Sequence, residues 1–316
     1  MTSTRVSASA GFALLASLLL AACGALPPRG DEPVSHALPP SLDSSLVRIA
    51  RDSTPEPHVS GFRLMAGGYY SLDARIELVR RASNSLDVQY YLIQNDRTGR
   101  LFMRSLRDAA LRGVRVRLLV DDLNTVGGDP MFRGLAAFPN VEVRLFNPFC
   151  CARQSLASRF VASLGEFGRL NHRMHNKLFI ADGAIAVMGG RNIADEYFAR
   201  SATSNFVDMD VLVVGHVVPQ LASIFDAYWN SREAYPVGAI LGTPADAAEA
   251  QRSFNHLVDE GDQMMSVRVP LSDMMGHRLL GTDLDSGRLE LAWGRPTRSP
   301  ISRRRLWRPR RKRRAR

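Results

Sequence analysis

The spacing of apolar residues alternates between helical and strand periods from about residue 67 onward. A helical period covers 72–81, with Ser71 as the expected N-cap, and a second covers 99–112, with Gly113 as its stop. Strand-like runs occupy 86–93, 114–120, 141–146 and 211–214, and a last helical pattern covers 219–229. Alternating strands and helices predict a layered α/β fold around a mixed central β-sheet.

A β-hairpin is predicted within this alternation. The apolar runs 177–181 and 184–188 flank Asp182-Gly183, and an Asp-Gly pair between two strands favours a tight two-residue turn. The hairpin therefore brings the residues just before 177 and just after 188 to the same end of the sheet.

The first 23 residues have the pattern of an export signal. Arg5 precedes a short apolar run over 12–22, which is shorter than the roughly 20 apolar residues of a transmembrane helix. The run ends in Leu20-Ala21-Ala22-Cys23, which resembles the lipobox of bacterial lipoproteins, where the cysteine is lipidated and becomes the mature N-terminus. A cleaved signal with an incidental cysteine is the alternative.

Acyl chains on Cys23 would anchor the protein stably in a membrane. We expect a periplasm-facing lipoprotein of the bacterial cell envelope, and by analogy Gly24 favours the outer membrane. Residues 24–60 are rich in Pro, Ser and Asp without a period that could bury one face, so they are predicted to be a flexible tether. Residues 61–262 are then the expected catalytic domain.

The net charge of +10 does not indicate a nucleic-acid-binding surface. Of 41 Lys and Arg residues, ten lie in 303–316, a stretch with no acidic residue, so the rest of the chain carries 31 basic and 31 acidic groups. A hydrophobic content of 45% with 23% charged residues is typical of a folded globular chain. Lys177 and Lys312 are the only lysines in the sequence.

One segment combines a nucleophile, a cation and an amide. His175, Lys177 and Asp182 form the pattern H-x-K-x₄-D, and Gly189-Gly190-Arg191-Asn192 follows after the next strand. Two residues apart at a strand entrance, His175 and Lys177 project to one face, and the glycine pair lets Asn192 approach it. This set suits a phosphoryl group, because imidazole can attack phosphorus while Lys177 and Asn192 hold the developing charge.

The segment resembles the phospholipase D superfamily, and more narrowly its cardiolipin-synthase-type members from bacterial envelopes. Further familial stretches lie at 86–92, 112–123, 143–149, 189–198 and 225–231, and the likeness runs from about 45 to 298. It implies a phospholipase D-like layered α/β/α domain and a metal-independent mechanism through a covalent phosphohistidine. His175 is then the nucleophile, Lys177 and Asn192 are phosphate ligands, and Asp182 supports the site without touching substrate.

The resemblance also implies an acid that orients the histidine, for which Asp208 is our candidate. Glu196 is a rival, although a helix-capping role would explain it equally well. His172 and His175 are spaced like a zinc pair, but no Cys or carboxylate cluster completes the coordination. Asp121-Asp122 could bind magnesium or, at the end of a strand, line the cleft or cap a turn. We favour no metal and no cofactor.

Two cysteines remain besides Cys23. Cys150 and Cys151 are neighbours in sequence, and a disulfide between adjacent cysteines is strained. We expect them to be partly buried small residues.

A second H-x-K pattern is missing from this chain, although superfamily chemistry uses two histidines. None of the later histidines, His216, His256 and His277, is followed two positions on by lysine. Residues 287–296 resemble the start of the second half of two-motif members. We therefore interpret 263–316 as the start of a truncated second half, ending in a basic tail that a frameshift could have produced.

Three functions are compatible with these observations. The first is phosphatidyl transfer from one phospholipid to the hydroxyl of another, as in cardiolipin synthesis, or to water. The second is a phosphodiesterase or nuclease that dimerises to bring two copies of His175 together. The third is a catalytically inactive lipoprotein. The anchor and the neutral body favour a phospholipid substrate over nucleic acid.

Overall fold

The computed structural model describes residues 26–28, 33–163, 166–259 and 270–295. The predicted export signal, the lipidation site Cys23 and the basic stretch 303–316 lie outside the described residues. Among those described, no helix combines the length and the apolar character needed to cross a membrane.

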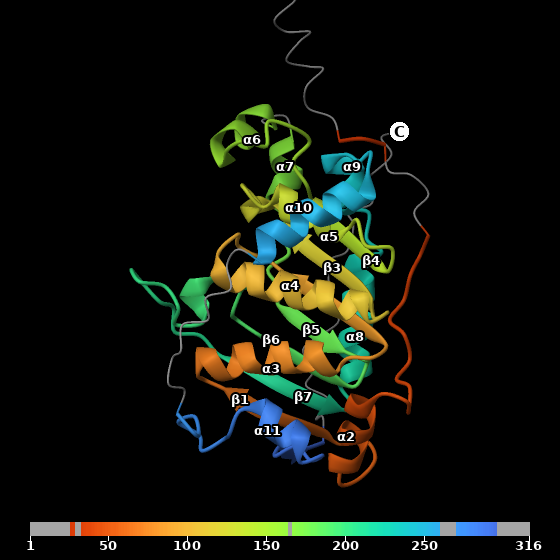
Figure 1. Cartoon of the computed structure of the whole chain (residues 1–316), viewed down its shortest axis with the longest axis vertical. Coiled ribbons are helices and arrows are strands. Elements are labelled where there is room, and N and C mark those ends of the chain that lie inside the picture. The colour runs from red at the N-terminus through yellow and green to blue at the C-terminus, as the bar shows by residue number, and fades with distance from the viewer. Residues whose placement is uncertain (1–25, 29–32, 164–165, 260–269, 296–316) are drawn as a thin grey trace, which may run out of the picture.

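A mixed β-sheet of nine strands forms the centre of the described chain (Figure 1). Its order is β8-β4-β3-β2-β5-β6-β7-β1-β9. The strands are β1 (Ser60–Met65), β2 (Ser85–Tyr90), β3 (Arg115–Asp121), β4 (Val141–Phe146), β5 (Leu178–Ala181), β6 (Ile185–Gly189), β7 (Asp210–Gly215), β8 (Ala234–Pro236) and β9 (Ala292–Gly294). The pairs β2–β3 and β3–β4 are parallel, and the remaining pairs are antiparallel. The predicted mixed α/β architecture is confirmed.

Helices cover both faces of the sheet and enclose a hydrophobic core on each (Figure 1). The larger core lies under α3 (Gly68–Arg81), α4 (Arg97–Leu111), α5 (Asp129–Leu135), α10 (Ala247–Asp259) and α11 (Leu280–Asp285). The smaller core lies under α8 (Val218–Trp229) on the opposite face. On β3, Leu118 and Val120 belong to the first core and Leu119 to the second, as the two-residue period of a strand requires.

Short helices complete the described chain. They are α2 (Ser45–Ser53), α6 (Leu156–Ala162), α7 (Phe167–Leu170), α9 (Val237–Leu241) and the 3₁₀ turns η1 (Asp122–Asn124) and η3 (Asp195–Tyr197).

The prediction of a flexible tether is wrong for residues 33–60. Helix α2 buries Leu46, Val47 and Ala50 against the domain, and the backbone N–H of Ala37 donates to both carboxylate oxygens of Asp226 on α8 (3.1 and 3.0 Å). Helix α2 has nine residues, too few to show a clear helical period in the sequence. The chain around Ala37 is held by backbone hydrogen bonds, which leave no pattern of apolar residues in the sequence.

The expected N-cap of the first long helix is also wrong. Helix α3 begins at Gly68, so Ser71 lies within its first turn, where its hydroxyl donates a hydrogen bond to buried Asp210. In sequence, a serine near the start of a helix looks the same whether its hydroxyl caps the helix or bonds to a distant residue such as Asp210.

A fully buried arginine joins the sheet to α8. Arg117 on β3 donates from Nε to Asp87 on β2 (2.7 Å) and from Nη2 to Asp226 on α8 (2.8 Å). Its guanidinium carbon also lies 4.8 Å from the ring centroid of Phe225. Three elements therefore depend on one cation in the interior.

We expect Arg117→Met to lower the free energy of unfolding by about 3–5 kcal/mol, because it leaves Asp87 buried without its charge partner. Urea denaturation of the two proteins measures the difference. Arg51→Ala is the control, since Arg51 and Asp52 form an exposed pair whose loss costs less than about 1 kcal/mol. Equal effects of the two substitutions would contradict the structural importance of Arg117.

Candidate active site

The predicted hairpin of β5 and β6 positions the H-x-K segment. Asp182 and Gly183 adopt the left-handed φ values of 50° and 64° that a tight hairpin turn requires, and Leu178 pairs with Met188. At the open end of the hairpin, Lys177 precedes β5 and its carbonyl accepts a hydrogen bond from the N–H of Gly189 (3.4 Å). The chain before β5 and the chain after β6 therefore meet at one end of the sheet, as predicted.

His175 and Lys177 lie side by side at this end. The Nζ atom of Lys177 is 3.3 Å from Nδ1 of His175 and donates to the His175 carbonyl at 2.8 Å. The imidazole is exposed, whereas the lysine side chain is buried. A buried cation beside an accessible imidazole can hold an anion while the imidazole reacts with it.

Tyr91, the residue that follows β2, contacts both groups. Its ring centroid is 4.7 Å from that of His175, and Nζ of Lys177 lies 5.1 Å from the Tyr91 centroid. Because β2 pairs with β5, the end of β2 lies beside the start of the hairpin. The sequence analysis missed Tyr91, since periodicity does not reveal which strands are neighbours.

The surroundings favour a neutral imidazole next to an ammonium. Burial lowers the pKa of His175, the charge of Lys177 lowers it further, and Asp208 opposes both. Burial also lowers the pKa of Lys177 to about 8, against the raising effect of Asp208, Asp121 and Asp210. Near neutral pH the imidazole is therefore free to act as a nucleophile while most Lys177 side chains carry a charge.

Asn192 approaches the same end of the sheet from the chain after β6. It is buried, and its Nδ2 donates to the hydroxyl of Tyr197 (2.8 Å), while Oδ1 has no hydrogen-bond partner among the described residues. Gly190 makes the close packing possible, because a Cβ atom there would lie 2.0 Å from a carboxylate oxygen of Asp208. Tyr197 was also missed, because only the fold places it against the amide.

The two predicted carboxylates lie at opposite ends of the hairpin. Asp208, half-buried before β7, accepts from the N–H of Met209 (2.7 Å) and acts electrostatically on His175 and Lys177. Asp182 is buried at the turn, where it accepts from the N–H groups of 83–85 and from the hydroxyl of Ser44. The structure thus groups His175, Lys177, Asn192 and Asp208, and places Asp182 in a supporting position away from them.

Known proteins resemble this chain over the same region. Residues 76–229 match the family described as "Cardiolipin synthase, PLD-like domain". Cardiolipin synthase C of Escherichia coli (strain K12) is 40% identical over 242 residues, which cover 71% of this chain and 46% of that protein. The chain belongs to the phospholipase D superfamily.

Other known proteins are similar to this chain at lower sequence identity. A cardiolipin synthase of Staphylococcus aureus (strain Mu50 / ATCC 700699) is 31% identical over 173 residues, 54% of this chain and 32% of that protein. The solved structure of NucT from Helicobacter pylori is 17% identical, with a TM-score of 0.40, and covers 56% of this chain and 99% of its own. The chain spans less than half the length of either cardiolipin synthase.

The acidic pair Asp121-Asp122, at the end of β3, anchors loops of this phospholipase D-like domain. Asp121 accepts from the N–H of Met174 (2.8 Å) and from Arg173 (3.1 Å), and burial raises its pKa to about 6. Asp122 accepts from two nitrogens of Arg153 and from the N–H of Phe149. The pair therefore fixes the backbone at Phe149 and at Met174, the residue directly before the H-x-K segment.

His172 makes a different contact from His175. Its Nδ1 lies 3.0 Å from the carbonyl oxygen of Gly168, on α7. The side chain of His172 therefore contacts the backbone of α7, whereas that of His175 contacts Lys177.

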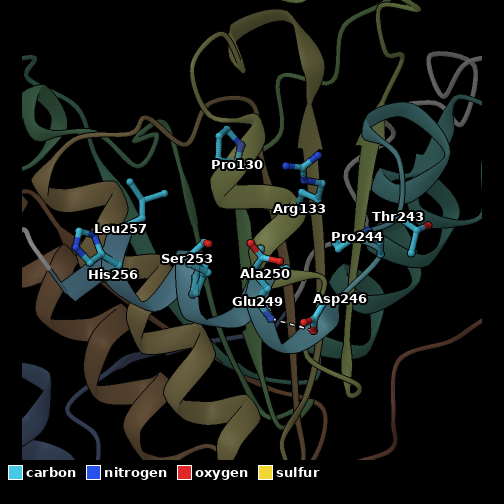
Figure 2. Close-up of a pocket in the computed structure, with 13 residues that line it drawn as sticks. Pro130, Arg133, Thr243, Pro244, Asp246, Glu249, Ala250, Ser253, His256 and Leu257 are labelled. Carbon is cyan, nitrogen blue, oxygen red and sulfur yellow. Dashed lines mark hydrogen bonds between the residues drawn. The ribbon is translucent and has the colours of Figure 1, made fainter.

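A cavity of about 570 Å³ opens beside the grouped residues and is lined in part by Tyr91, Asn192 and Tyr197. A second cavity, of about 610 Å³, lies between α5 and α10 (Figure 2). Pro130 and Arg133 line it from one side, and Glu249 and Ser253 of α10 from the other. It shares no lining residue with the H-x-K site, so the first cavity is the one placed to hold a substrate.

The two lysines of the chain make the pKa of Lys177 directly measurable. With ¹⁵N-labelled lysine, NMR should show one ammonium titrating near pH 8 and another near the ordinary value of about 10.4. Lys177→Arg should remove the first signal and leave the second.

The same titration tests the influence of Asp208. Asp208→Asn should move the Lys177 midpoint to lower pH, because it removes a charge that raises the pKa of Lys177. Two signals titrating together near 10.4 would show that Lys177 is solvated, contrary to its buried position.

Proposed function

We propose that this domain carries out phospholipase D-type phosphodiester chemistry on phospholipids. His175 attacks the phosphorus, and the phosphatidyl group passes to the hydroxyl of a second phospholipid, as in cardiolipin synthesis, or to water. The main support is the exposed imidazole of His175, whose Nδ1 lies 3.3 Å from the Nζ atom of buried Lys177 and whose pKa is lowered by burial and by that lysine. Tyr91, which contacts both residues, lines the same cavity as Asn192.

In the first step an imidazole nitrogen of His175 forms the N–P bond and the P–O bond to the leaving alcohol breaks. Lys177 and an N–H of Asn192 hold the phosphoryl oxygens as negative charge develops. Asp208 stabilises the imidazolium character that arises on His175, in line with its raising effect on the pKa of that ring. The phosphohistidine is then opened by the acceptor hydroxyl.

The leaving alkoxide needs a proton that His175 cannot supply while it acts as nucleophile. We propose that a second copy of the chain brings its own His175 to the site. The exposed position of His175 and the exposed apolar side chains of Leu64, Met188 and Met209 near the open end of the hairpin support a contact there.

The setting that suits this chemistry is a membrane surface. We propose that residues 1–23 direct export, that Cys23 carries the lipid anchor, and that residues 61–262 form the catalytic domain in the bacterial envelope. An anchored domain would meet phospholipids at high local concentration.

The decisive experiment uses phosphatidylglycerol with ³²P in its phosphate. Protein denatured at alkaline pH should carry a label that is stable to base and labile to acid, as a phosphoramidate is, and diphosphatidyl product should accumulate. His175→Ala should abolish the label and reduce turnover by at least about 10³-fold, as expected for loss of a covalent nucleophile. His172→Ala is the matched control and should keep both.

Full turnover by His175→Ala would refute the assignment of the nucleophile. Turnover of DNA alone would indicate the nuclease function, and inactivity toward both substrates would indicate a binding protein. A strictly monomeric protein with full turnover, as measured by light scattering, would contradict the need for a second histidine.

The rate should depend on pH in a bell-shaped manner. It should rise as pH increases through the lowered pKa of His175, because the neutral ring is the nucleophile, and fall near pH 8 as Lys177 loses its proton. In Lys177→Arg the falling limb should move to higher pH, since arginine keeps its charge. An unchanged falling limb in that variant would assign it to another group.

A further inference from the structure

Glu196 is a carboxylate without a partner in the wall of the cavity beside Asn192. It is half-buried in η3, and none of the described residues forms an ion pair or hydrogen bond with its side chain. Its neighbour Asp195, in contrast, accepts from the N–H and hydroxyl of Thr98 (2.9 and 2.7 Å). The carboxylate of Glu196 is therefore free of ion pairs with the described residues and can contact a ligand in the cavity.

The alternative explanations of Glu196 are not supported by its position. The alternative role of a helix cap is not supported, because Glu196 lies within η3, whose N-cap is Ala194, and no side chain caps that turn. Asp208, and not Glu196, is the carboxylate that raises the pKa of His175. The side chain of Glu196 is therefore available to the cavity.

The other cavity walls are polar but uncharged, or apolar. Side-chain amides come from Gln94, Asn124 and Gln154, which make no side-chain hydrogen bonds within the described part of the chain, and apolar surface comes from Leu156 and Phe206. Among the described lining residues, Glu196 is the one charged group. Such walls fit a small polar group with hydrogen-bond donors and repel an anion.

We propose that this cavity binds the alcohol that is exchanged at phosphorus, and that Glu196 selects alcohols carrying a second hydrogen-bond donor, an ammonium or a hydroxyl. The inference rests on the proposed phosphatidyl transfer and deepens it. Asn192 and Tyr197 line this cavity and also border the phosphoryl site, so an alcohol held against Glu196 lies next to the reacting phosphorus.

The exchange balances without a further reactant. The alcohol oxygen forms a P–O bond as the N–P bond to His175 breaks, and the imidazole recovers its electron pair. The hydroxyl proton passes to the second imidazole that the proposed function requires. Glu196 takes no part in bond making, since it holds the far end of the alcohol.

A competition between two-carbon alcohols tests this assignment. The full-length protein is given phosphatidylglycerol vesicles with equimolar ethanolamine, ethylene glycol, ethanol and glycolate, and the phosphatidyl products are separated by mass. Ethanolamine and ethylene glycol should each exceed ethanol and glycolate by about tenfold or more. Product ratios are internal to each reaction, so a general change in turnover cancels.

Glu196→Gln should reduce the ratio of ethanolamine to ethylene glycol product about tenfold, because the ammonium loses its counter-charge. Glu196→Asp keeps the charge and should retain the preference. Glu249→Gln is the matched control, because Glu249 lines the separate cavity of Figure 2 and its loss should leave all ratios unchanged.

The possible failures are distinct. Unchanged product ratios in Glu196→Gln, or efficient use of glycolate by the unmodified protein, would overturn the role of Glu196 while leaving phosphatidyl transfer intact. If the unmodified protein forms neither phosphatidyl-alcohol nor phosphatidic acid, the proposed function fails and the assignment of the cavity fails with it.

Discussion

Two buried carboxylates hold the two ends of the β5–β6 hairpin, and the site depends on both. At the turn, Asp182 accepts three backbone N–H groups from the chain that leads into β2, which fixes the hairpin against its neighbour strand. At the open end, Asp210 pairs with Arg75 (3.0 Å) and accepts from the N–H of Arg191 (3.3 Å), which fixes the chain that carries Asn192. With both ends fixed, the distance from His175 and Lys177 to Asn192 no longer depends on flexible loops.

The same burial that orders Lys177 also weakens its charge. Removing an ammonium from water lowers its pKa, and three carboxylates around it limit the fall to about 8. With a pKa near 8, most Lys177 side chains keep their charge at neutral pH, while the lowered pKa of His175 favours a neutral imidazole. Of these carboxylates Asp208 also raises the pKa of His175, so its removal would shift the pKa values of Lys177 and His175 together.

Local features of the site could be predicted from sequence, whereas contacts between distant segments could not. Hydrophobic periodicity and turn chemistry predict the Asp182-Gly183 turn, both ends of β4, and the position of His175 and Lys177 at the start of a strand. The order of the strands does not, because β2 lies between β3 and β5 for reasons of packing that no single stretch encodes. The roles of Tyr91 and Tyr197, the docking of residues 33–60 and the true start of α3 all depend on such long-range contacts.

The proposed phosphate ligands and the proposed nucleophile differ in solvent exposure. Lys177 and Asn192, the proposed phosphate ligands, are buried in this domain, while the imidazole of His175 is accessible. Phosphate binding can therefore be complete within one domain, but proton transfer to and from the alcohol needs a group that reaches the site from outside it. Glu196 lies in the wall of the cavity where that alcohol would bind. The unpaired carboxylate and the accessible imidazole would therefore both act on the alcohol, one by binding it and the other at the reacting phosphorus. In the proposed mechanism the domain holds the phosphorus, and the alcohol is exchanged on the open side of the site.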